Sequence, residues 1–226
     1  MNDKRPHLDD EDNFEGITSG MKILPYAVKS RVSNIFIFKL DEAITDASYY
    51  RNITDVCNQA TEDDQIHFYI NSPGGLLSGL STILDAIEKT DALTAAVVTG
   101  DCHSAASIIM LHCDVVDVGR MANALCHNVS FGTSGRASDI QAQVNHTTKQ
   151  ATRLLKETYE GFMSESEIDL LLEGKQFYFD AEEIVTRLED RDEYRDAVVA
   201  TMKEEAAVEA PNPVPKPVKK TTKPKE

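Results

Sequence analysis

The chain has 226 residues, 41% of them hydrophobic and 27% charged, and a formal net charge of −15 at pH 7. This length suits one domain of about 150–200 residues with terminal segments, and the hydrophobic fraction suffices for a packed core. The negative charge argues against nucleic acid as the main partner. A membrane partner is not expected either, because no apolar run approaches the roughly 20 residues of a spanning helix.

The ends of the chain differ in composition from its middle. Residues 1–20 are acidic, poor in apolar residues and without the apolar stretch of a signal peptide, so we expect them to be disordered. Residues 21–190 are expected to form the folded domain, and residues 191–210 a charged helical extension. Residues 211–226 are rich in Pro and Lys, which predicts an extended, unstructured tail or, alternatively, an arm for an acidic partner.

Hydrophobic periodicity predicts alternating strands and helices from residue 34 onward. Strands are expected at 34–40, 65–70, 95–99, 115–118 and 124–126. Helices are expected at 47–59, 76–89, 104–112, 138–162 and 181–208. Because strand–helix–strand repeats form right-handed crossovers, this order predicts an α/β fold with a mostly parallel sheet.

The four cysteines do not have the spacing of metal ligands; they are Cys57, Cys102, Cys113 and Cys126. Three of them lie in apolar stretches, where a free cysteine behaves as a small hydrophobic residue. We therefore expect reduced thiols rather than disulfides, a cytoplasmic location, and neither a bound metal nor a cofactor.

Ser104 is the leading candidate for a nucleophile. It follows the apolar run 95–99 and Gly100, and it precedes small and apolar residues that predict a buried helix. A serine at a helix start lies near free backbone N–H groups and the positive end of the helix dipole, which can stabilise an oxyanion. The competing interpretation is an ordinary helix N-cap.

Two further segments suit the same chemistry. His127 follows a short apolar stretch, where an imidazole could take the serine proton or could serve only as a hydrogen-bonded structural residue. Upstream, a strand runs into Asn-Ser-Pro-Gly-Gly at 71–75, whose glycines let the backbone approach a ligand closely. His103 is the second candidate for the base, although a side chain adjacent to the serine should point away from it.

These segments, in this order and spacing, resemble the proteolytic subunit of the Clp protease, the ClpP family. The resemblance rests on 71–75, on Gly-x-x-x-Ser at 100–104, on His127 and on the glycine-containing stretch 132–140. It implies the ClpP/crotonase-like spiral of ββα units, an α/β fold, in which 138–162 would be a protruding handle helix.

The resemblance implies a role for each of these residues. Ser104 would be the nucleophile and His127 the general base, and the oxyanion hole would use the backbone N–H groups of Ala105 and Gly75, with Gly74 as the alternative to Gly75. It also implies a serine endopeptidase that acts on protein or peptide substrates and assembles into homo-oligomeric rings, with an AAA+ ATPase unfoldase as a candidate partner. Divergent members of this kind include phage-encoded proteins.

The acid of the triad is not evident in the sequence. The family has an Asp shortly before a helix start, which is Asp180-Ala181-Glu182-Glu183 in this chain, and counting back from it gives Gln176. A shift of one gives Lys175, and the nearest carboxylate is Glu173. Gln176 could orient the imidazole through its amide oxygen, Glu173 could reach it from a shifted turn, or the site is degraded. Replacing the acid of a chymotrypsin-type triad by its amide lowers turnover about 10⁴-fold. If the acid is missing from this chain, we therefore expect a slow enzyme rather than an inactive one.

Asn128-Val129 is a second departure, because the family usually has Gln-Pro after the histidine. Two other functions stay open at this point: a ClpP-like scaffold or regulatory ring subunit without activity, and a crotonase-like acyl-CoA enzyme. Glu173 or Gln176 within hydrogen-bond reach of His127 would favour the peptidase, and an Nδ1 without a partner would favour the scaffold. The setting of Ser104 argues against the acyl-CoA enzyme.

Overall fold

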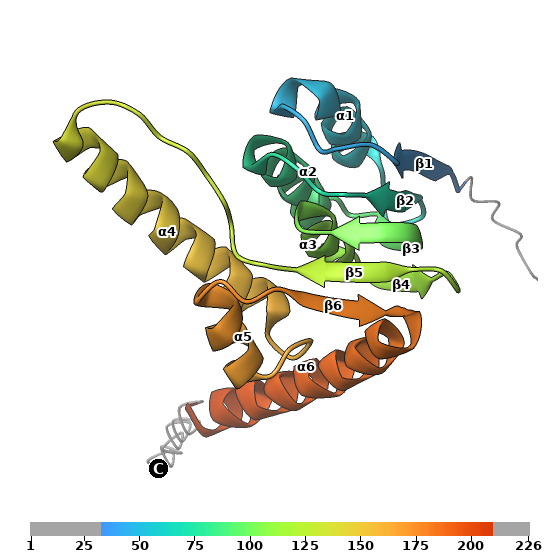
Figure 1. The fold of residues 1–226 in the computed structure, drawn as a ribbon. Helices are drawn as coiled ribbons and strands as arrows, with labels where there is room; N and C mark the ends of the chain where they lie inside the picture. The colour runs from blue at the N-terminus through green and yellow to red at the C-terminus, as the bar shows by residue number, and fades with distance from the viewer. Residues whose placement is uncertain (1–32, 210–226) are drawn as a thin grey trace, which may run out of the picture. The chain divides into compact units, whose positions relative to one another are not determined.

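The computed structural model describes residues 33–209, so the segments expected to be disordered, 1–20 and 211–226, lie outside the described residues. The described part is built around one sheet (Figure 1), with strands β1 Ile35–Leu40, β2 Gln65–Ser72, β3 Leu93–His103, β4 Val115–Val118, β5 Asn123–Cys126 and β6 Phe177–Asp180. The strand order is β1-β2-β3-β5-β6, with β4 paired beside β3. All of these pairs are parallel except β5–β6. The predicted α/β fold with a mostly parallel sheet is confirmed.

Strand β3 is longer than the predicted strand 95–99, because it has two partners in succession. Its first part, Ala95–Val98, pairs with β4, and its last part, Asp101–His103, pairs with β5. The change of partner brings the carboxyl ends of β3 and β5 side by side (Figure 1). The segments that carry Ser104 and His127 therefore leave the sheet at neighbouring strand ends, the edge at which parallel sheets usually bind ligands.

The helices are the three-ten turn η1 Ala47–Tyr50 followed by α1 Arg51–Gln59, α2 Leu77–Lys89, α3 Ala105–His112, α4 Ala137–Tyr159, α5 Glu165–Leu172 and α6 Ala181–Glu209. Helix α5 and strand β6 were not predicted. Helix α4 ends before the expected residue 162, because the chain turns at Gly161 with φ +81°. Within residues 33–209, none of the helices combines the length and apolarity needed to span a bilayer.

The core lies between the sheet and helices α2 and α3. On β2 the side chains of Ile66, Phe68 and Ile70 are fully buried, and the residues between them belong to the other face, as the period of two requires. Helix α3 is apolar all round and is buried from Ala105 to Leu111. The residue that precedes α3 therefore stands on a rigid, fully packed support.

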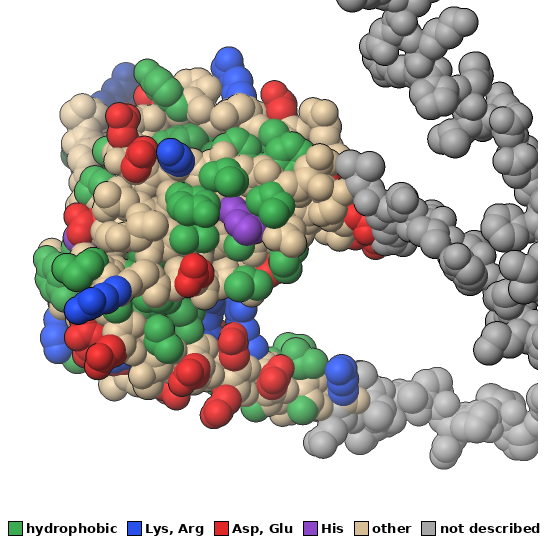
Figure 2. Space-filling view, turned by 90° about the vertical axis from the view of Figure 1, so that its right-hand side faces the viewer, with side chains coloured by type: hydrophobic (Ala, Val, Ile, Leu, Met, Phe, Trp, Pro, Cys, Tyr) green, Lys and Arg blue, Asp and Glu red, His purple; other side chains and the backbone are tan. Residues whose placement is uncertain are grey.

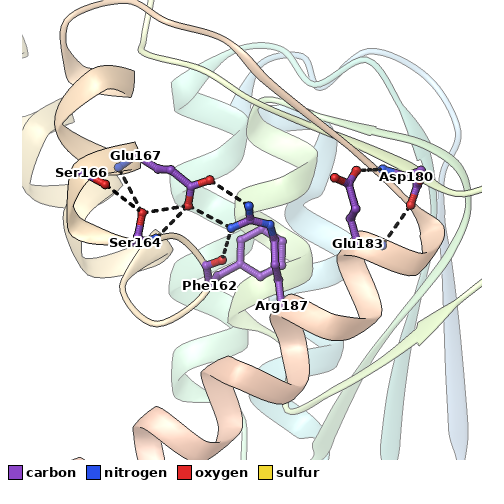
Figure 3. Close-up of polar contacts among 7 residues, drawn as sticks. All are labelled: Phe162, Ser164, Ser166, Glu167, Asp180, Glu183 and Arg187. Atoms are coloured by element: carbon purple, nitrogen blue, oxygen red, sulfur yellow. Dashed lines mark hydrogen bonds and ion pairs between the residues drawn. The ribbon is translucent and has the colours of Figure 1, made fainter.

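One ion pair and two helix caps fix the C-terminal elements (Figure 3). Arg187 of α6 donates to both carboxylate oxygens of Glu167 of α5, at 2.8 and 3.0 Å, and to the carbonyl of Phe162 at 3.1 Å. Glu167 also completes a capping box with Ser164 at the start of α5. The hydrogen bond from Arg187 is the largest influence on this carboxyl and lowers its pKa to about 2.

Helix α6 runs without a break across residue 190, so the boundary expected between 190 and 191 does not coincide with the end of an element. Arg191 is 4% exposed and donates to the carbonyls of Leu111 at 2.7 Å and Thr158 at 3.4 Å. Burial lowers the pKa of its guanidinium to about 10. Since these carbonyls belong to the last turns of α3 and α4, Arg191 ties α6 to both helices.

Candidate active site

Ser104 occupies the sharp turn between β3 and α3. It has φ 55° and ψ −120°, and among the described residues it is the only one other than glycine with a positive φ. Such a conformation costs about 1–3 kcal/mol and persists only where the surroundings enforce it. A serine on a strained turn from a strand into a helix presents its Oγ outward, which is the geometry of a nucleophile rather than of a simple cap. Consistent with this, the Ser104 side chain makes no capping hydrogen bond.

The backbone on both sides of Ser104 is held by hydrogen bonds. Its N–H donates to the carbonyl of Leu125 on β5 at 2.7 Å. Its carbonyl accepts from the Ser107 hydroxyl at 2.8 Å, and that hydroxyl also lies 2.9 Å from the hydroxyl of Tyr159 on α4. Ser107 and Tyr159 are both completely buried. Three elements, β5, α3 and α4, thus hold the strained residue in place.

Burial also decides which groups near Ser104 can react. Desolvation raises the pKa of the Cys126 thiol to about 11 and that of Cys102 well above its ordinary value. It likewise raises the pKa of the Tyr159 hydroxyl, which therefore stays protonated. All four cysteines are buried and unpaired, as the sequence predicted. Because a thiol must ionise to attack, the buried cysteines are poor nucleophiles.

The glycine turn brings backbone close to Ser104. Gly74 has φ +83°, and a Cβ there would lie 2.4 Å from the carbonyl oxygen of His103. Its own N–H donates to the Ser72 hydroxyl at 3.2 Å. The next residue, Gly75, pairs with Ile44 through bonds that use the carbonyl of Gly74 and the N–H of Leu76. These bonds leave the N–H of Gly75 directed away from Ile44, because successive backbone groups in an extended chain point to opposite sides.

Ser104, His127, Gly75 and Ala105 line one pocket of ≈ 420 Å³. Ala105 is the first residue of α3, so its N–H has no acceptor within the helix. The remaining lining is largely apolar and comes from α2, α3, α4 and the segment after His127: Leu76, Leu77, Leu80, Ile108, Val129, Ser130, Phe131, Gly132 and Leu155. A larger cavity of ≈ 840 Å³ between α4, α5 and α6 contains none of the predicted catalytic residues, so size alone does not identify the site.

His127 follows β5 and is half-buried. Its Nδ1 lies 2.6 Å from the carbonyl oxygen of the next residue, Asn128. The other candidate for the base, His103, has its Nε2 2.5 Å from the Asn123 side-chain oxygen and its ring edge-on to Tyr178. His103 does not line the pocket of Ser104.

The two residues predicted as possible third members of the triad lie on the segment between α5 and β6. Glu173 is the C-terminal cap of α5 and Gln176 precedes β6, and both are exposed. The Gln176 side-chain oxygen accepts from the Tyr178 hydroxyl at 3.4 Å. Within residues 33–209, no hydrogen bond joins either side chain to His127, and no group of His, Cys, Asp or Glu side chains is arranged to hold a metal ion.

Comparison with known proteins identifies the family of this chain. The model of the Clp protease family matches residues 23–186. The chain belongs to the Clp protease family. Among curated members of this family, the ATP-dependent Clp protease proteolytic subunit 3 of Rhizobium meliloti is 33% identical over 106 residues, which are 44% of this chain and 54% of the relative. Subunit 2 of Pseudomonas aeruginosa is 28% identical over 156 residues, 65% of this chain and 73% of the relative.

Subunit 3 of Rhizobium etli is 32% identical over 108 residues, 45% of this chain and 56% of the relative. The chain thus spans about half the length of the first curated Clp protease relatives that it matches. Most of α6 lies beyond the family match, which ends at residue 186.

Two residues of the site, Ser107 and Tyr159, were not singled out in the sequence, and Asn128 was noted only as a departure from the family pattern, not as the acceptor at Nδ1. The spacing of Ser107, three residues after Ser104, gave a signal, because the first turn of a helix brings such positions together. No pattern in the sequence pointed to the carbonyl of Asn128.

Proposed function

We propose that this member of the Clp protease family is a serine endopeptidase of the ClpP type. Ser104 is the nucleophile, His127 the general base, and the N–H groups of Gly75 and Ala105 form the oxyanion hole. The single observation that carries this is the strained Ser104, which lines one pocket with His127, Gly75 and Ala105, and within residues 33–209 no acceptor is found for the N–H groups of these last two residues. Gly75 is preferred to Gly74 because the N–H of Gly74 already donates to Ser72.

The proposed reaction follows from these positions. The Ser104 Oγ attacks the scissile carbonyl carbon while its proton moves to Nε2 of His127, and the electron pair of the carbonyl moves to oxygen. The resulting oxyanion accepts from the N–H groups of Gly75 and Ala105, an interaction worth about 3–4 kcal/mol per donor in comparable sites. His127 then returns the proton to the leaving amine as the C–N bond breaks, and water hydrolyses the acyl-enzyme by the same route.

The apolar lining supports a preference for substrates with an apolar side chain beside the scissile bond. Leu77, Leu80, Ile108, Phe131 and Leu155 supply this surface. The curated relatives are named as proteolytic subunits of an ATP-dependent protease. By this likeness we propose unfolded or partner proteins as substrates, cleaved inside a ring chamber of this chain and delivered by an AAA+ ATPase. A cytoplasmic location stays a prediction.

Exposed apolar residues on the sheet support assembly. Ile35 and Ile37 on β1, Leu93 on β3 and Val115 on β4 are each between 44% and 57% exposed. The face without the buried Ile66, Phe68 and Ile70 carries these side chains, since Ile35 pairs with Gln65 and Gln65 with Leu93. Asp and Glu side chains gather along α6 (Figure 2). An apolar sheet face on an otherwise acidic protein favours a protein partner.

The second candidate function is a catalytically impaired scaffold or regulatory ring subunit. It is favoured by one observation: within the described residues, no carboxylate hydrogen-bonds His127. The fold and the exposed sheet face would serve this role equally well.

Labelling with a fluorophosphonate probe tests the peptidase against the scaffold. Wild type should gain the mass of one probe less HF, because fluoride leaves as the serine O–P bond forms, and Ser104→Ala should gain none. Ser130→Ala is the matched control, because Ser130 lines the same pocket but is not on the turn into α3; it should label as wild type does. Absence of labelling in wild-type protein that has assembled would reject the peptidase and leave the scaffold.

A further inference from the structure

The tautomer of His127 is fixed by its neighbour in the chain. Nδ1 lies 2.6 Å from the main-chain oxygen of Asn128. A carbonyl oxygen can only accept a hydrogen bond, so Nδ1 must carry the proton. In the neutral ring Nε2 is then left with its lone pair, which is the state that a general base needs at the nitrogen that takes up the proton.

Asn128 is itself held at both ends of its amide. Its Oδ1 accepts from the N–H of Val129 at 2.7 Å, and its Nδ2 donates to the carbonyl of Leu172 at 2.7 Å. Leu172 is the last residue of α5, and carbonyls in the last turn of a helix have no intrahelical donor. The side chain thus anchors the segment after β5 to an element that follows 44 residues later in the chain.

We propose that Asn128 replaces the triad acid: its main-chain carbonyl holds the Nδ1 proton of His127, and its side chain fixes that carbonyl by bonding to α5. This inference rests on the proposed function, in which His127 is the base. Asn128 is a positioning residue, because it acts through the imidazole and does not touch the reacting atoms. Glu173 and Gln176 are then not needed to orient the ring.

An Asn128 carbonyl in place of the triad acid is expected to lower the catalytic rate. A triad acid does two things: it holds the imidazole in the correct tautomer, and its negative charge stabilises the imidazolium that forms. The Asn128 carbonyl supplies the first function without a full charge for the second, and a neutral hydrogen bond is about half as strong as a charge-assisted one. The proposal therefore predicts an enzyme slower than one with the acid but faster than the roughly 10⁴-fold loss caused by the wrong tautomer.

The test compares Asn128→Ala with Glu173→Ala and Gln176→Ala in the full chain. Asn128→Ala keeps the main-chain carbonyl but frees it from α5, so the rate constant for fluorophosphonate labelling of Ser104 should fall about tenfold to a hundredfold, as expected for a misplaced reacting group. The two comparison variants remove exposed side chains and should stay within about twofold of wild type. Thermal unfolding of each variant shows that it is folded at the labelling temperature.

A second measurement needs no variant of Asn128. Nitrogen-15 NMR of histidine-labelled wild type, with His127 assigned through His127→Gln, distinguishes the two neutral tautomers. Protonated Nδ1 supports the proposal, and protonated Nε2 overturns it. The proposal is also overturned if Glu173→Ala or Gln176→Ala slows labelling while Asn128→Ala does not. If wild type fails to label at all, the proposed peptidase function fails, and the tautomer still decides whether Asn128 orients the ring.

Discussion

Ser104 and His127 line the same pocket, but the chain holds them in different ways. The backbone of Ser104 is bonded on both sides, to Leu125 and to Ser107, and buried Tyr159 stands behind these bonds. The ring of His127 depends on one carbonyl of the adjacent residue. The proposed nucleophile is therefore built into the core, whereas the proposed base is oriented by an irregular segment, and the second arrangement is the easier one to alter without loss of the fold.

The largest effect is expected from a change at the turn that faces Ser104. Gly74→Ala places a Cβ 2.4 Å from the His103 carbonyl oxygen and 2.8 Å from the Ser104 Cβ, at a φ of +83° that alanine disfavours. Labelling of Ser104 should fall about a hundredfold or more. Gly132→Ala is the control, because a Cβ there meets nothing within 4 Å although Gly132 lines the same pocket. A folded Gly74→Ala variant that labels at the wild-type rate would contradict this reading of the turn.

The next largest effect is expected at the ion pair of Glu167 with Arg187, outside the pocket of Ser104, and concerns the pH dependence of the unfolding free energy. The pKa of Glu167 is lowered from 4.5 to about 2 in the folded protein. The ion pair with Arg187 therefore adds stability that is complete above the unfolded pKa and is lost as pH falls from about 4.5 towards 2. Glu167→Gln should lower the unfolding free energy at pH 7 by about 2–3 kcal/mol and flatten its dependence on pH in that window.

Urea unfolding at a series of pH values measures this difference. The control is Glu157→Gln, because the ion pair of Glu157 with Arg153 is well exposed and should contribute less than about 1 kcal/mol. Equal pH dependence of Glu167→Gln and wild type between pH 2 and 5 would show that the pair with Arg187 does not stabilise the fold.

A smaller effect is expected from the support behind Ser104. Tyr159→Phe removes one buried hydroxyl and should cost about 1 kcal/mol in unfolding free energy. It should also slow labelling about threefold to tenfold, because the Ser107 hydroxyl that bonds the Ser104 carbonyl loses one of its hydrogen-bond partners. Tyr194→Phe is the matched control, since its hydroxyl bonds Glu160 in an exposed position. Loss of stability with an unchanged labelling rate would reduce Tyr159 to a structural role.

The smallest effect is expected on the segment before β6. The Lys175 ammonium lies 4.7 Å from the centre of the Phe177 ring and lines no part of the Ser104 pocket. Lys175→Ala should therefore cost about 0.5–1 kcal/mol in stability and leave labelling within about twofold. A large change in labelling rate in either direction would show that this segment reaches the site. It would also weaken the contrast between the support of Ser104 and that of His127.

The sequence predicted those parts of the molecule that depend on local pattern and burial. The strand before Ser104, the apolar helix after it and the glycine turn all left clear signals, because each needs a particular residue type at a particular place. Signals for helix α5 and strand β6 were weak, and the role of Asn128 left no signal. Main-chain carbonyls are present at every position, so an acceptor such as that of Asn128 can be found only when the fold is known. The predicted roles of Glu173 and Gln176 stay predictions, since counting along the chain does not locate a side chain in space.

Arg191 determines how much of the chain must fold together. A chain cut at residue 186, where the family match ends, would lose both Arg187 and Arg191. Four acceptors would then lose an arginine donor: the Glu167 carboxylate and the carbonyls of Phe162, Leu111 and Thr158. The first turns of α6 are thus needed to hold α3, α4 and α5 together. The end of a stable fragment, for a fusion protein or for limited proteolysis, is therefore expected after Arg191, even though the family match ends at residue 186.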